Sequence, residues 1–394
     1  MYSKKFIPYG RQDISEDDIN AVVEVLKGDF LTQGPTIKAF EDSIVKYTGA
    51  KYAVAVNSNT SGLHIACMAL DLGENDLLWT SPNTFVASAN CGRFCGADVD
   101  FVDIDLQTFN ISISALKEKL YNAKKIGKLP KILVPVHMCG TACDMVEIKK
   151  LSVEYGFKII EDSAHAIGAR YNNKPVGSCE HSDISVFSFH PVKIITTGEG
   201  GIITTNDKNI YDRLLRLRTH GITREPEFMQ NNNPGSWYYE MLELSHNYRM
   251  TDIQAALGLS QMLRLNEFVQ KRNYLANKYI ELFNNTSIRF QQISNNYYSS
   301  YHLFPILLVQ KNSKKEIFEE LKKANIGVNL HYIPVYLHPY YSKLGFKPGY
   351  CKNAEEYYKR AISIPLYPKM TEEDIEYIFN KIMEICSKYL NKDS

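Results

Sequence analysis

Five side chains suited to chemistry stand just after short apolar runs of the sequence. Asp162 ends one run and Lys193 follows the next, while Thr60 and Ser61 follow an earlier run and Phe85 another. In open α/β sheets, ligands bind beyond the carboxyl ends of the strands, so residues in this position are the first to consider for a binding site. Together they offer a carboxylate, an amine, hydroxyl groups at a helix start, and an aromatic face.

This set of groups matches what pyridoxal phosphate requires of a protein. The cofactor needs a lysine that bonds its aldehyde carbon, a carboxylate that keeps its ring nitrogen protonated, and a cradle for its phosphate. Each residue also has a purely structural interpretation, because exposed lysines, aspartates after strands, and Thr-Ser helix caps are common. The pattern alone therefore leaves both interpretations open.

A sheet of short strands would have to position these residues. Most of the expected strands are separated by helical segments, of which one starts at Ser61 and another at Phe85. Such alternation favours an α/β fold in which helices cover a mainly parallel sheet. The expected strands are AVAVN (53–57), DLLWTS (76–81), VDFVDID (99–105), KILVPVH (131–137), FKIIED (157–162) and ISVFSF (184–189).

The sequence before this sheet predicts an ordered N-terminal helix. Ser15 and Asp18 form a capping-box pattern, and the helix should end at Gly28. Its apolar face would carry residues spaced by three or four positions. These are Ile19, Val22, Val23 and Leu26.

The sequence after the sheet predicts a second, smaller α/β unit. A loop rich in Asn, Pro and Gly (222–246) precedes one long helix from Thr251 to about Asn284. HLFPILLV, a helix up to Gly327, VNLHYIPV and a last helix then follow. We expect a large domain over residues 1–250, and a linking helix with a small C-terminal domain over residues 251–394.

Composition limits the partners that this chain could have. Over 394 residues, 45 Lys and Arg against 44 Asp and Glu give a net charge of +1, which offers no field for nucleic acid or an anionic membrane. No apolar run approaches the roughly 20 residues that span a bilayer, and no secretory signal is visible, so we expect a cytoplasmic protein. P-loop, GxGxxG and HExxH motifs are absent.

The eight cysteines are expected to be free thiols. Cys91 and Cys95 are four residues apart, as are Cys139 and Cys143, and His137 stands near the second pair. A metal site would be one interpretation. Small buried apolar side chains are the favoured one, because the paired CxxC spacing of a zinc site is missing, and we expect no metal.

Ordered motifs along nearly the whole chain resemble those of the DegT/DnrJ/EryC1/StrS aminotransferases. The motifs are FLTQGP (30–35), FEDSIVKYTGAKYAVAVNSNTSGL, PNTFVASAN, IIEDSAHAIGA, SVFSFHPVKIITTGEGG, HNYRMTDIQAALGLSQ and HYIPVY. The resemblance implies the aspartate-aminotransferase fold, which is fold type I of the pyridoxal-phosphate-dependent transferases, with a seven-stranded-type sheet in the large domain. It also implies pyridoxal phosphate as the cofactor.

The resemblance assigns cofactor contacts residue by residue. Lys193 would bond the cofactor and move the proton, and Asp162 would pair with the ring nitrogen. His165 would lie near the ring hydroxyl, unless it is a packed core histidine. Ser188 would contact the phosphate together with Thr60 and Ser61, whose helix start favours an anion.

Other roles implied by the resemblance concern the cofactor ring, the substrate and a second subunit. Phe85 would stack on the ring, unless it is an ordinary core aromatic. Asn247 would reach the phosphate of the neighbouring subunit in a homodimer with shared active sites, or else cap the long helix. His331 and Tyr332 would face the substrate, although VNLHYIPV could instead be only a strand that leaves the small domain.

Within the family, HPVKIITTGEGG, SSYHLFPILL and HYIPVY resemble the members that aminate UDP-linked keto sugars on the way to pseudaminic acid. Asn59 and Gly62 stand where alanines are common in those members. The resemblance implies transfer of an amino group from L-glutamate to C4 of a 4-keto-6-deoxy nucleotide sugar. Amination at C3, amination of a cyclitol ketone, and a regulatory paralogue without turnover remain alternatives.

Overall fold

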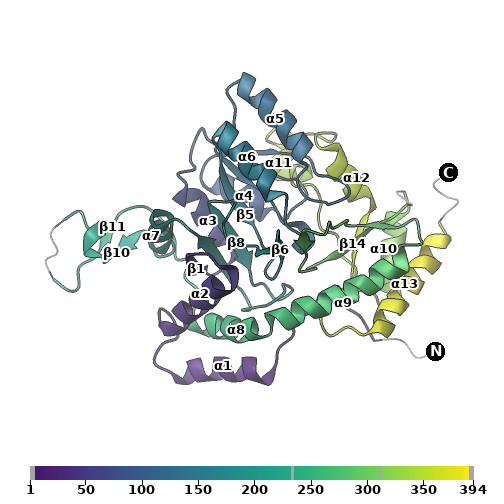
Figure 1. Ribbon diagram of the computed structural model, residues 1–394, viewed down its shortest axis with the longest axis horizontal. Coiled ribbons are helices and arrows are strands. Elements are labelled where there is room, and N and C mark those ends of the chain that lie inside the picture. The colour runs from purple at the N-terminus through teal and green to yellow at the C-terminus, as the bar shows by residue number, and fades with distance from the viewer. Residues whose placement is uncertain (1–4, 232–234, 310–311, 390–394) are drawn as a thin grey trace.

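The computed structural model describes residues 5–231, 235–309 and 312–389, and a seven-stranded sheet lies at its centre (Figure 1). The sheet order is β1-β9-β8-β5-β4-β2-β3. Neighbouring strands pair in parallel except β9, which runs antiparallel to both β1 and β8. The strands are β1 (Tyr52–Val56), β2 (Leu77–Thr80), β3 (Asp98–Phe101), β4 (Ile132–Val134), β5 (Lys158–Asp162), β8 (Ile184–Ser188) and β9 (Gly201–Thr205).

The predicted α/β class and the six expected strands are confirmed, whereas β9 was missed. Apolar residues alternate between the two faces of the sheet, as the period of two in a strand requires. Val54 and Val56 of β1 pack on one face, and Ala53 and Ala55 pack on the other.

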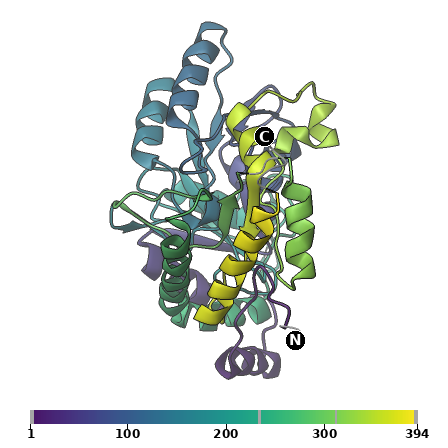
Figure 2. The same ribbon diagram turned by 90° about the vertical axis from the view of Figure 1, so that its right-hand side faces the viewer.

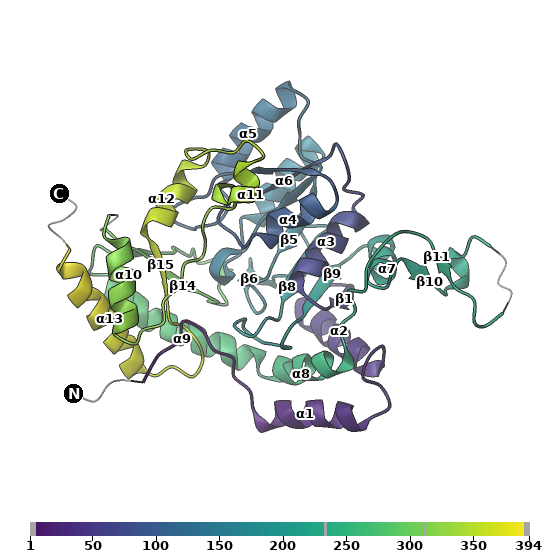
Figure 3. The same cartoon turned by 180° about the vertical axis from the view of Figure 1, so that it is seen from behind.

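Helices cover both faces of the sheet (Figures 1 and 3). Leu63 of α3, Cys91 of α4 and Leu214 of α7 belong to the cluster on one face. Phe40 of α2 and Leu116 of α5 belong to the cluster on the other, with α6 beside them. These helices are α2 (Pro35–Thr48), α3 (Asn59–Ala69), α4 (Ala87–Phe94), α5 (Ile113–Lys125), α6 (Met145–Tyr155) and α7 (Lys208–Leu217).

The N-terminal helix α1 (Glu16–Lys27) begins at Ser15 with the predicted capping box. Its contact with the next layer is polar. Asp18 is its buried residue and accepts hydrogen bonds from Ser260 and Gln261 at 2.6 Å. Ile19 and Leu26 remain about half exposed, at 46% and 54%. The expected apolar face therefore exists, but part of it stays uncovered within the described chain.

The long helix expected from Thr251 is two helices, α8 (Asp252–Leu263) and α9 (Leu265–Phe283), so the prediction of one helix was wrong. Thr251 caps α8 with a capping box to Gln254. The break lies at Arg264, whose φ of −105° and ψ of 3° leave helical geometry. Its guanidinium bonds the carbonyl of Asp13 at 3.0 Å and the carboxylate of Asp18 at 2.6 Å, which are contacts remote in sequence.

A smaller antiparallel sheet of order β12-β14-β15 follows, packed by α9, α10 and α13 (Figure 2). Its buried cluster also includes Ile7 from the N-terminal segment. The division into domains at residue 250 stays a prediction. The elements are β12 (Arg289–Phe290), β14 (Phe304–Leu307), α10 (Lys314–Lys323), β15 (Ala361–Ile364) and α13 (Glu372–Ser387).

The segment VNLHYIPV is not a strand, contrary to one expectation for it. Asn329 makes a single bridge to Ser363, and a short 3-10 turn follows at Val335–Leu337. Tyr332 N donates to Asn83 Oδ1 at 3.1 Å, which ties this segment to the large sheet. In the described residues, no helix combines the length and apolar character needed to cross a bilayer.

Candidate active site

A cavity of about 560 Å³ lies at the carboxyl ends of β5 and β8. Segments far apart in the sequence form its walls, including the segment 329–332 that returns from the small sheet. Most of the residues predicted for the site line it. They are Lys193, Asp162, His165, Ser188, Thr60, Phe85, His331 and Tyr332.

Lys193 projects from the loop that connects β8 to β9. Its backbone N donates to the His190 carbonyl at 2.9 Å, and Thr196 Oγ1 holds the loop by donating to the Phe189 carbonyl at 3.0 Å. Burial lowers the pKa of the Lys193 amine to about 8, although the nearby Asp162 carboxylate opposes the shift. Such an amine is partly neutral near physiological pH, as a nucleophile and proton carrier must be.

Asp162 ends β5 and is 4% exposed. Its Oδ1 accepts the backbone N–H of Ala164 at 3.1 Å, and its Oδ2 accepts the Ser88 hydroxyl at 2.6 Å. Ser88 in turn lies 2.7 Å from Thr84 Oγ1. Hydrogen bonds therefore hold both carboxylate oxygens of Asp162 in place at the cavity wall.

Sequence reasoning missed Ser88 and Thr84. The two hydroxyls stand four residues apart around the start of α4, and this i, i+4 spacing was the available signal. Nothing local connects them to Asp162, because the contact joins residues 74 positions apart.

The first turn of α3 faces the cavity with hydroxyls and backbone amides. Ser58 is the N-cap, so the helix begins two residues earlier than predicted. Ser58, Thr60 and Ser188 line the cavity, and the aligned amides of a helix start favour an anion there. Ser61 is absent from the cavity lining that the structure describes. Its backbone N donates to Ser58 Oγ at 3.1 Å, so it supports the cap.

Asn59 and Gly62 have structural reasons to differ from alanine. Asn59 Nδ2 donates to the Val186 carbonyl at 3.2 Å and so links α3 to β8. A methyl group at Gly62 would lie 2.7 Å from Val186 Cγ1. Glycine therefore allows α3 to approach the sheet closely.

His165 is buried and packed, and it also belongs to the cavity wall. Its Nε2 lies 3.1 Å from the Tyr332 hydroxyl, and its ring packs on His302 with centroids 4.5 Å apart. Burial and the nearby Lys193 charge hold the pKa of His165 well below its usual value. Its buried Nδ1 has no hydrogen-bond partner among the described residues. An orphaned polar atom in a cavity wall is expected to meet a ligand, which fits a ring hydroxyl at this position.

His302 was also missed, although the sequence places it directly before an apolar strand. It is buried and lines the same cavity. Burial, followed by the Lys193 charge, lowers the pKa of its imidazole well below the usual value. The two packed histidines are therefore neutral donors or acceptors near the lysine.

The cavity lining also carries the groups expected near the ring and the substrate. Phe85 is 59% exposed, which rules out an ordinary core aromatic and leaves its face free for a ligand. Its ring centroid lies 6.3 Å from that of Tyr332. His331 Nδ1 lies 2.8 Å from Ser363 Oγ, and burial lowers the pKa of this imidazole to about 3.

Asn247 is absent from the cavity lining within the described chain. It is exposed, and its carbonyl lies 3.5 Å from Asn57 Nδ2 beyond the end of β1. Thr251, not Asn247, caps α8, so the expected capping alternative is wrong. Its role toward a second subunit stays a prediction.

The remaining cysteine and histidine candidates have structural contacts. His137 Nε2 lies 2.6 Å from Glu161 Oε2, and its Nδ1 accepts the backbone N–H of Cys143 at 3.1 Å. All eight cysteines are free. In the parts of the chain that the structure describes, no group of three or more His, Cys, Asp or Glu side chains is placed to hold a metal.

Known proteins resemble this chain over nearly its full length. The DegT/DnrJ/EryC1/StrS aminotransferase family matches residues 12–383. A UDP-4-amino-4,6-dideoxy-N-acetyl-beta-L-altrosamine transaminase of Campylobacter jejuni is 37% identical, over 97% of this chain and 98% of its own length. The Helicobacter pylori aminotransferase involved in pseudoaminic acid biosynthesis is 31% identical and superposes with a TM-score of 0.88, over 98% of this chain and 100% of its own.

A putative sugar aminotransferase of Streptococcus pneumoniae, solved in its pyridoxal-phosphate form, has the same fold. It is 28% identical with a TM-score of 0.88, and the match covers 98% of this chain and 100% of its own. These likenesses confirm the predicted fold type, the cofactor and the aminotransferase class. The half-buried lysine, the buried carboxylate, the helix start and the orphaned histidine nitrogen fit that cofactor. The chain belongs to the DegT/DnrJ/EryC1/StrS family of pyridoxal-phosphate-dependent aminotransferases.

Proposed function

We propose that the protein transfers an amino group from L-glutamate to the C4 ketone of a UDP-linked 4-keto-6-deoxy sugar. The observation that carries this proposal is the cavity in which the partly neutral Lys193 amine and the buried Asp162 carboxylate stand together. Relatives named for UDP-sugar transamination and pseudoaminic acid biosynthesis support the choice of acceptor. Each turnover would convert glutamate and the keto sugar into 2-oxoglutarate and the amino sugar.

Lys193 and Asp162 would share the chemical work. Pyridoxal phosphate supplies a protonated ring that accepts electrons from the carbon that loses a proton. Asp162 would keep that ring nitrogen protonated, and Ser88 would hold the carboxylate in position. Lys193 Nζ would bond the cofactor at rest. Once free, it would take the proton from Cα of the donor and return a proton at the sugar carbon in the second half of the cycle.

The remaining cavity residues would bind and orient. Ser188, Thr60 and the amides that Ser58 and Ser61 arrange at the start of α3 would hold the phosphate. Phe85 would cover one face of the ring. His165 would meet the ring hydroxyl through its unpaired Nδ1. A regulator without turnover would not need this complete set.

His331 and Tyr332 would contact the substrate from the segment 329–332, which forms part of the cavity wall. The Tyr332 hydroxyl contacts His165, which would lie beside the cofactor ring. The ring of Tyr332 lies near that of the exposed Phe85. A sugar ring bound between this segment and the cofactor would therefore lie against both aromatic side chains. Such faces suit the apolar side of a deoxy sugar.

We also propose a homodimer in which each active site includes Asn247 from the other subunit. Asn247 is exposed beyond β1, close to the start of α3, so a two-fold contact there would bring it to a second cavity. Exposed apolar side chains on α1, the following turn and α8 provide surface for such a contact. They are Ile19, Leu26, Phe30, Leu31 and Leu263.

The substrate is tested with the purified holoenzyme, glutamate and a panel of 4-keto and 3-keto nucleotide sugars. We expect mass spectrometry to detect an amino product from the UDP-linked 4-keto-6-deoxy sugar, together with 2-oxoglutarate. Lys193→Ala serves as the inactive control. Amination only of a 3-keto sugar or a cyclitol ketone would overturn the proposed substrate, and no amination of any ketone would overturn the activity.

A further inference from the structure

His302 is a buried histidine of the cavity lining to which the proposed function gives no role. It is 5% exposed, and its ring packs on that of His165. Neither of its ring nitrogens has a hydrogen-bond partner among the described residues. Because buried polar groups are almost always hydrogen-bonded, an unpartnered imidazole in a cavity wall is expected to bind a ligand.

The backbone around His302 is held by hydrogen bonds to three other segments. The His302 N–H donates to the Cys139 carbonyl at 2.8 Å, and the His302 carbonyl accepts from Arg272 Nη1 at 3.4 Å. Ser300 Oγ donates to the His165 carbonyl at 2.8 Å. The segments that carry the two packed histidines are therefore bonded to each other, which fixes how the two rings meet.

Arg272 of α9 places a buried positive charge beside this backbone. Its side chain is 1% exposed, and Nη1 also donates to the carbonyls of Tyr301 at 3.3 Å and Leu366 at 2.8 Å. In the parts of the chain that the structure describes, no carboxylate pairs with this guanidinium, and its Nε has no partner. A buried charge without a counter-charge is costly, and an anion bound nearby would offset that cost.

The other charged side chains of the cavity do not supply this counter-charge. Apart from histidines, the described lining contains Lys193, Asp162 and Glu199 as ionisable acids and bases of opposite sign. Lys193 and Asp162 are assigned to the cofactor in the proposed function. Glu199 is exposed, so water screens its charge. The counter-charge for Arg272 is therefore expected from a ligand.

We propose that His302 binds the α-carboxylate of the amino donor, and that the buried charge of Arg272 attracts this anion into the cavity. The inference rests on the proposed function, in which the donor is an amino acid. His302 packs on His165, the proposed neighbour of the cofactor's ring hydroxyl. In pyridoxal phosphate that hydroxyl stands beside the aldehyde carbon with which the donor amine reacts. The α-carboxylate is bonded to the carbon that carries this amine, so it would arrive beside His302.

Donor analogues test which group His302 contacts. L-Isoglutamine has an amide in place of the α-carboxylate, whereas L-glutamine has one in place of the side-chain carboxylate. The first half-reaction is followed in single turnover by the visible band of the holoenzyme. We expect wild type to prefer glutamate over isoglutamine by about tenfold or more, because the amide loses a hydrogen bond to a charged group.

His302→Phe keeps an aromatic ring against His165 but has no N–H. This variant should lose most of the preference for glutamate over isoglutamine and keep the preference for glutamate over glutamine. His302→Gln restores an N–H donor and should recover part of the first preference. An unchanged preference over isoglutamine in His302→Phe, or loss of the preference over glutamine instead, would overturn the assignment.

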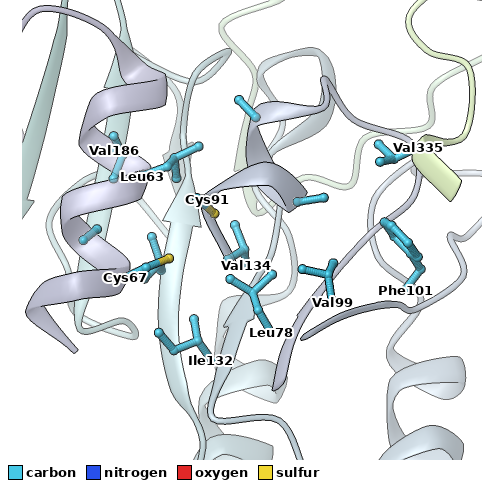
Figure 4. Packing of buried hydrophobic residues seen from close by; sticks show 14 of the residues in the cluster. Leu63, Cys67, Leu78, Cys91, Val99, Phe101, Ile132, Val134, Val186 and Val335 are labelled. Carbon is cyan, nitrogen blue, oxygen red and sulfur yellow. The ribbon is translucent and has the colours of Figure 1, made fainter. Parts of the chain in front are cut away.

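Binding of α-methyl-L-glutamate gives a readout without turnover, because this analogue has no proton on Cα. Its Kd, titrated from the visible band, should rise by about tenfold or more in His302→Phe. His64→Phe is the matched control and should leave the Kd unchanged. His64 is also buried, but it follows Leu63 on α3, in the packing layer that Figure 4 shows, and it lines a different cavity.

The role of the Arg272 charge is tested with the same titration. Arg272→Met removes the charge and should raise the Kd more than Arg272→Lys, which keeps it. Equal Kd values for the two variants, with folding confirmed by thermal unfolding, would refute the electrostatic role. If Arg272→Met does not fold, a Kd for Arg272→Lys as weak as that of His302→Phe would refute it.

A second half-reaction separates this inference from the proposed function. The keto sugar carries no carboxylate, so enzyme loaded with pyridoxamine phosphate should aminate it in His302→Phe within about twofold of the wild-type rate. An equal loss in both half-reactions would show that His302 has a general structural role and would reject the inference. Failure of wild type to react with glutamate, or with any keto sugar, would instead reject the proposed function.

Discussion

Replacing Ser88 by alanine tests whether the hydroxyl beneath Asp162 supports the chemistry. The substitution removes the donor that lies 2.6 Å from Asp162 Oδ2 and leaves the backbone contact from Ala164 to Oδ1 in place. The carboxylate then loses the hydrogen bond that holds its Oδ2 in place. A carboxylate that is less firmly held would pair less well with the cofactor's ring nitrogen, and the bound cofactor would be a weaker electron acceptor.

The size of the effect follows from the charge on Asp162. A hydrogen bond to a charged group contributes about 1.5–3 kcal/mol. Since about 1.36 kcal/mol corresponds to tenfold in rate, full expression of this contribution would lower kcat by about tenfold to about 150-fold. Ser88→Thr keeps a hydroxyl and should recover much of the loss.

The assay is steady-state amination by Ser88→Ala, with bound cofactor measured from its visible absorption band and folding from thermal unfolding. Ser185→Ala is the matched control, because Ser185 is buried and its hydroxyl lies 2.7 Å from Ser163 Oγ, whereas the Asp162 carboxylate bonds Ser88 and Ala164. A kcat for Ser88→Ala within about twofold of wild type, with cofactor bound, would refute the reasoning.

Three further predictions concern the cofactor site and the dimer. Asp162→Asn keeps the shape but loses the charge, so turnover should fall strongly with some cofactor still bound, and near-normal kcat would show that another group protonates the ring. The rate at which apoenzyme takes up pyridoxal phosphate should rise with pH through about 8, because only the neutral Lys193 amine attacks the aldehyde, and a stopped-flow profile centred near pH 10.5 would contradict the lowered pKa. Mixing Lys193→Ala with Asn247→Ala under subunit exchange should restore about a quarter of wild-type activity, since half the dimers then hold one intact site of two. If exchange is confirmed and no activity returns, Asn247 serves the site of its own subunit or no site.

Local patterns predicted the parts of the fold that depend on neighbours in sequence. The Ser15 capping box, the strand ends at Asp162 and before Lys193, and the start of a helix near Thr60 all follow from short-range signals. Family resemblance then attached roles to these residues. The structure gathers most of them around one cavity, including Phe85, whose exposure a sequence cannot reveal.

Features that depend on contacts between residues far apart in the sequence were missed, because local patterns carry no signal of such contacts. The break at Arg264 accompanies bonds to Asp13 and Asp18, more than 240 residues earlier. Antiparallel β9 is a short run whose direction depends on how the loop after Lys193 returns to the sheet. The role of Ser88 depends on its hydrogen bond to Asp162, which is remote in sequence. The role of His302 likewise depends on its packing against His165.

The central claim is that Lys193 bonds the cofactor and carries the proton. Borohydride reduction of the purified holoenzyme, followed by peptide mapping, tests it most directly. We expect the visible band of the bound cofactor to disappear and the cofactor mass to remain on the peptide that contains Lys193. Cofactor fixed to another lysine, or no stable adduct after reconstitution with pyridoxal phosphate, would contradict this account.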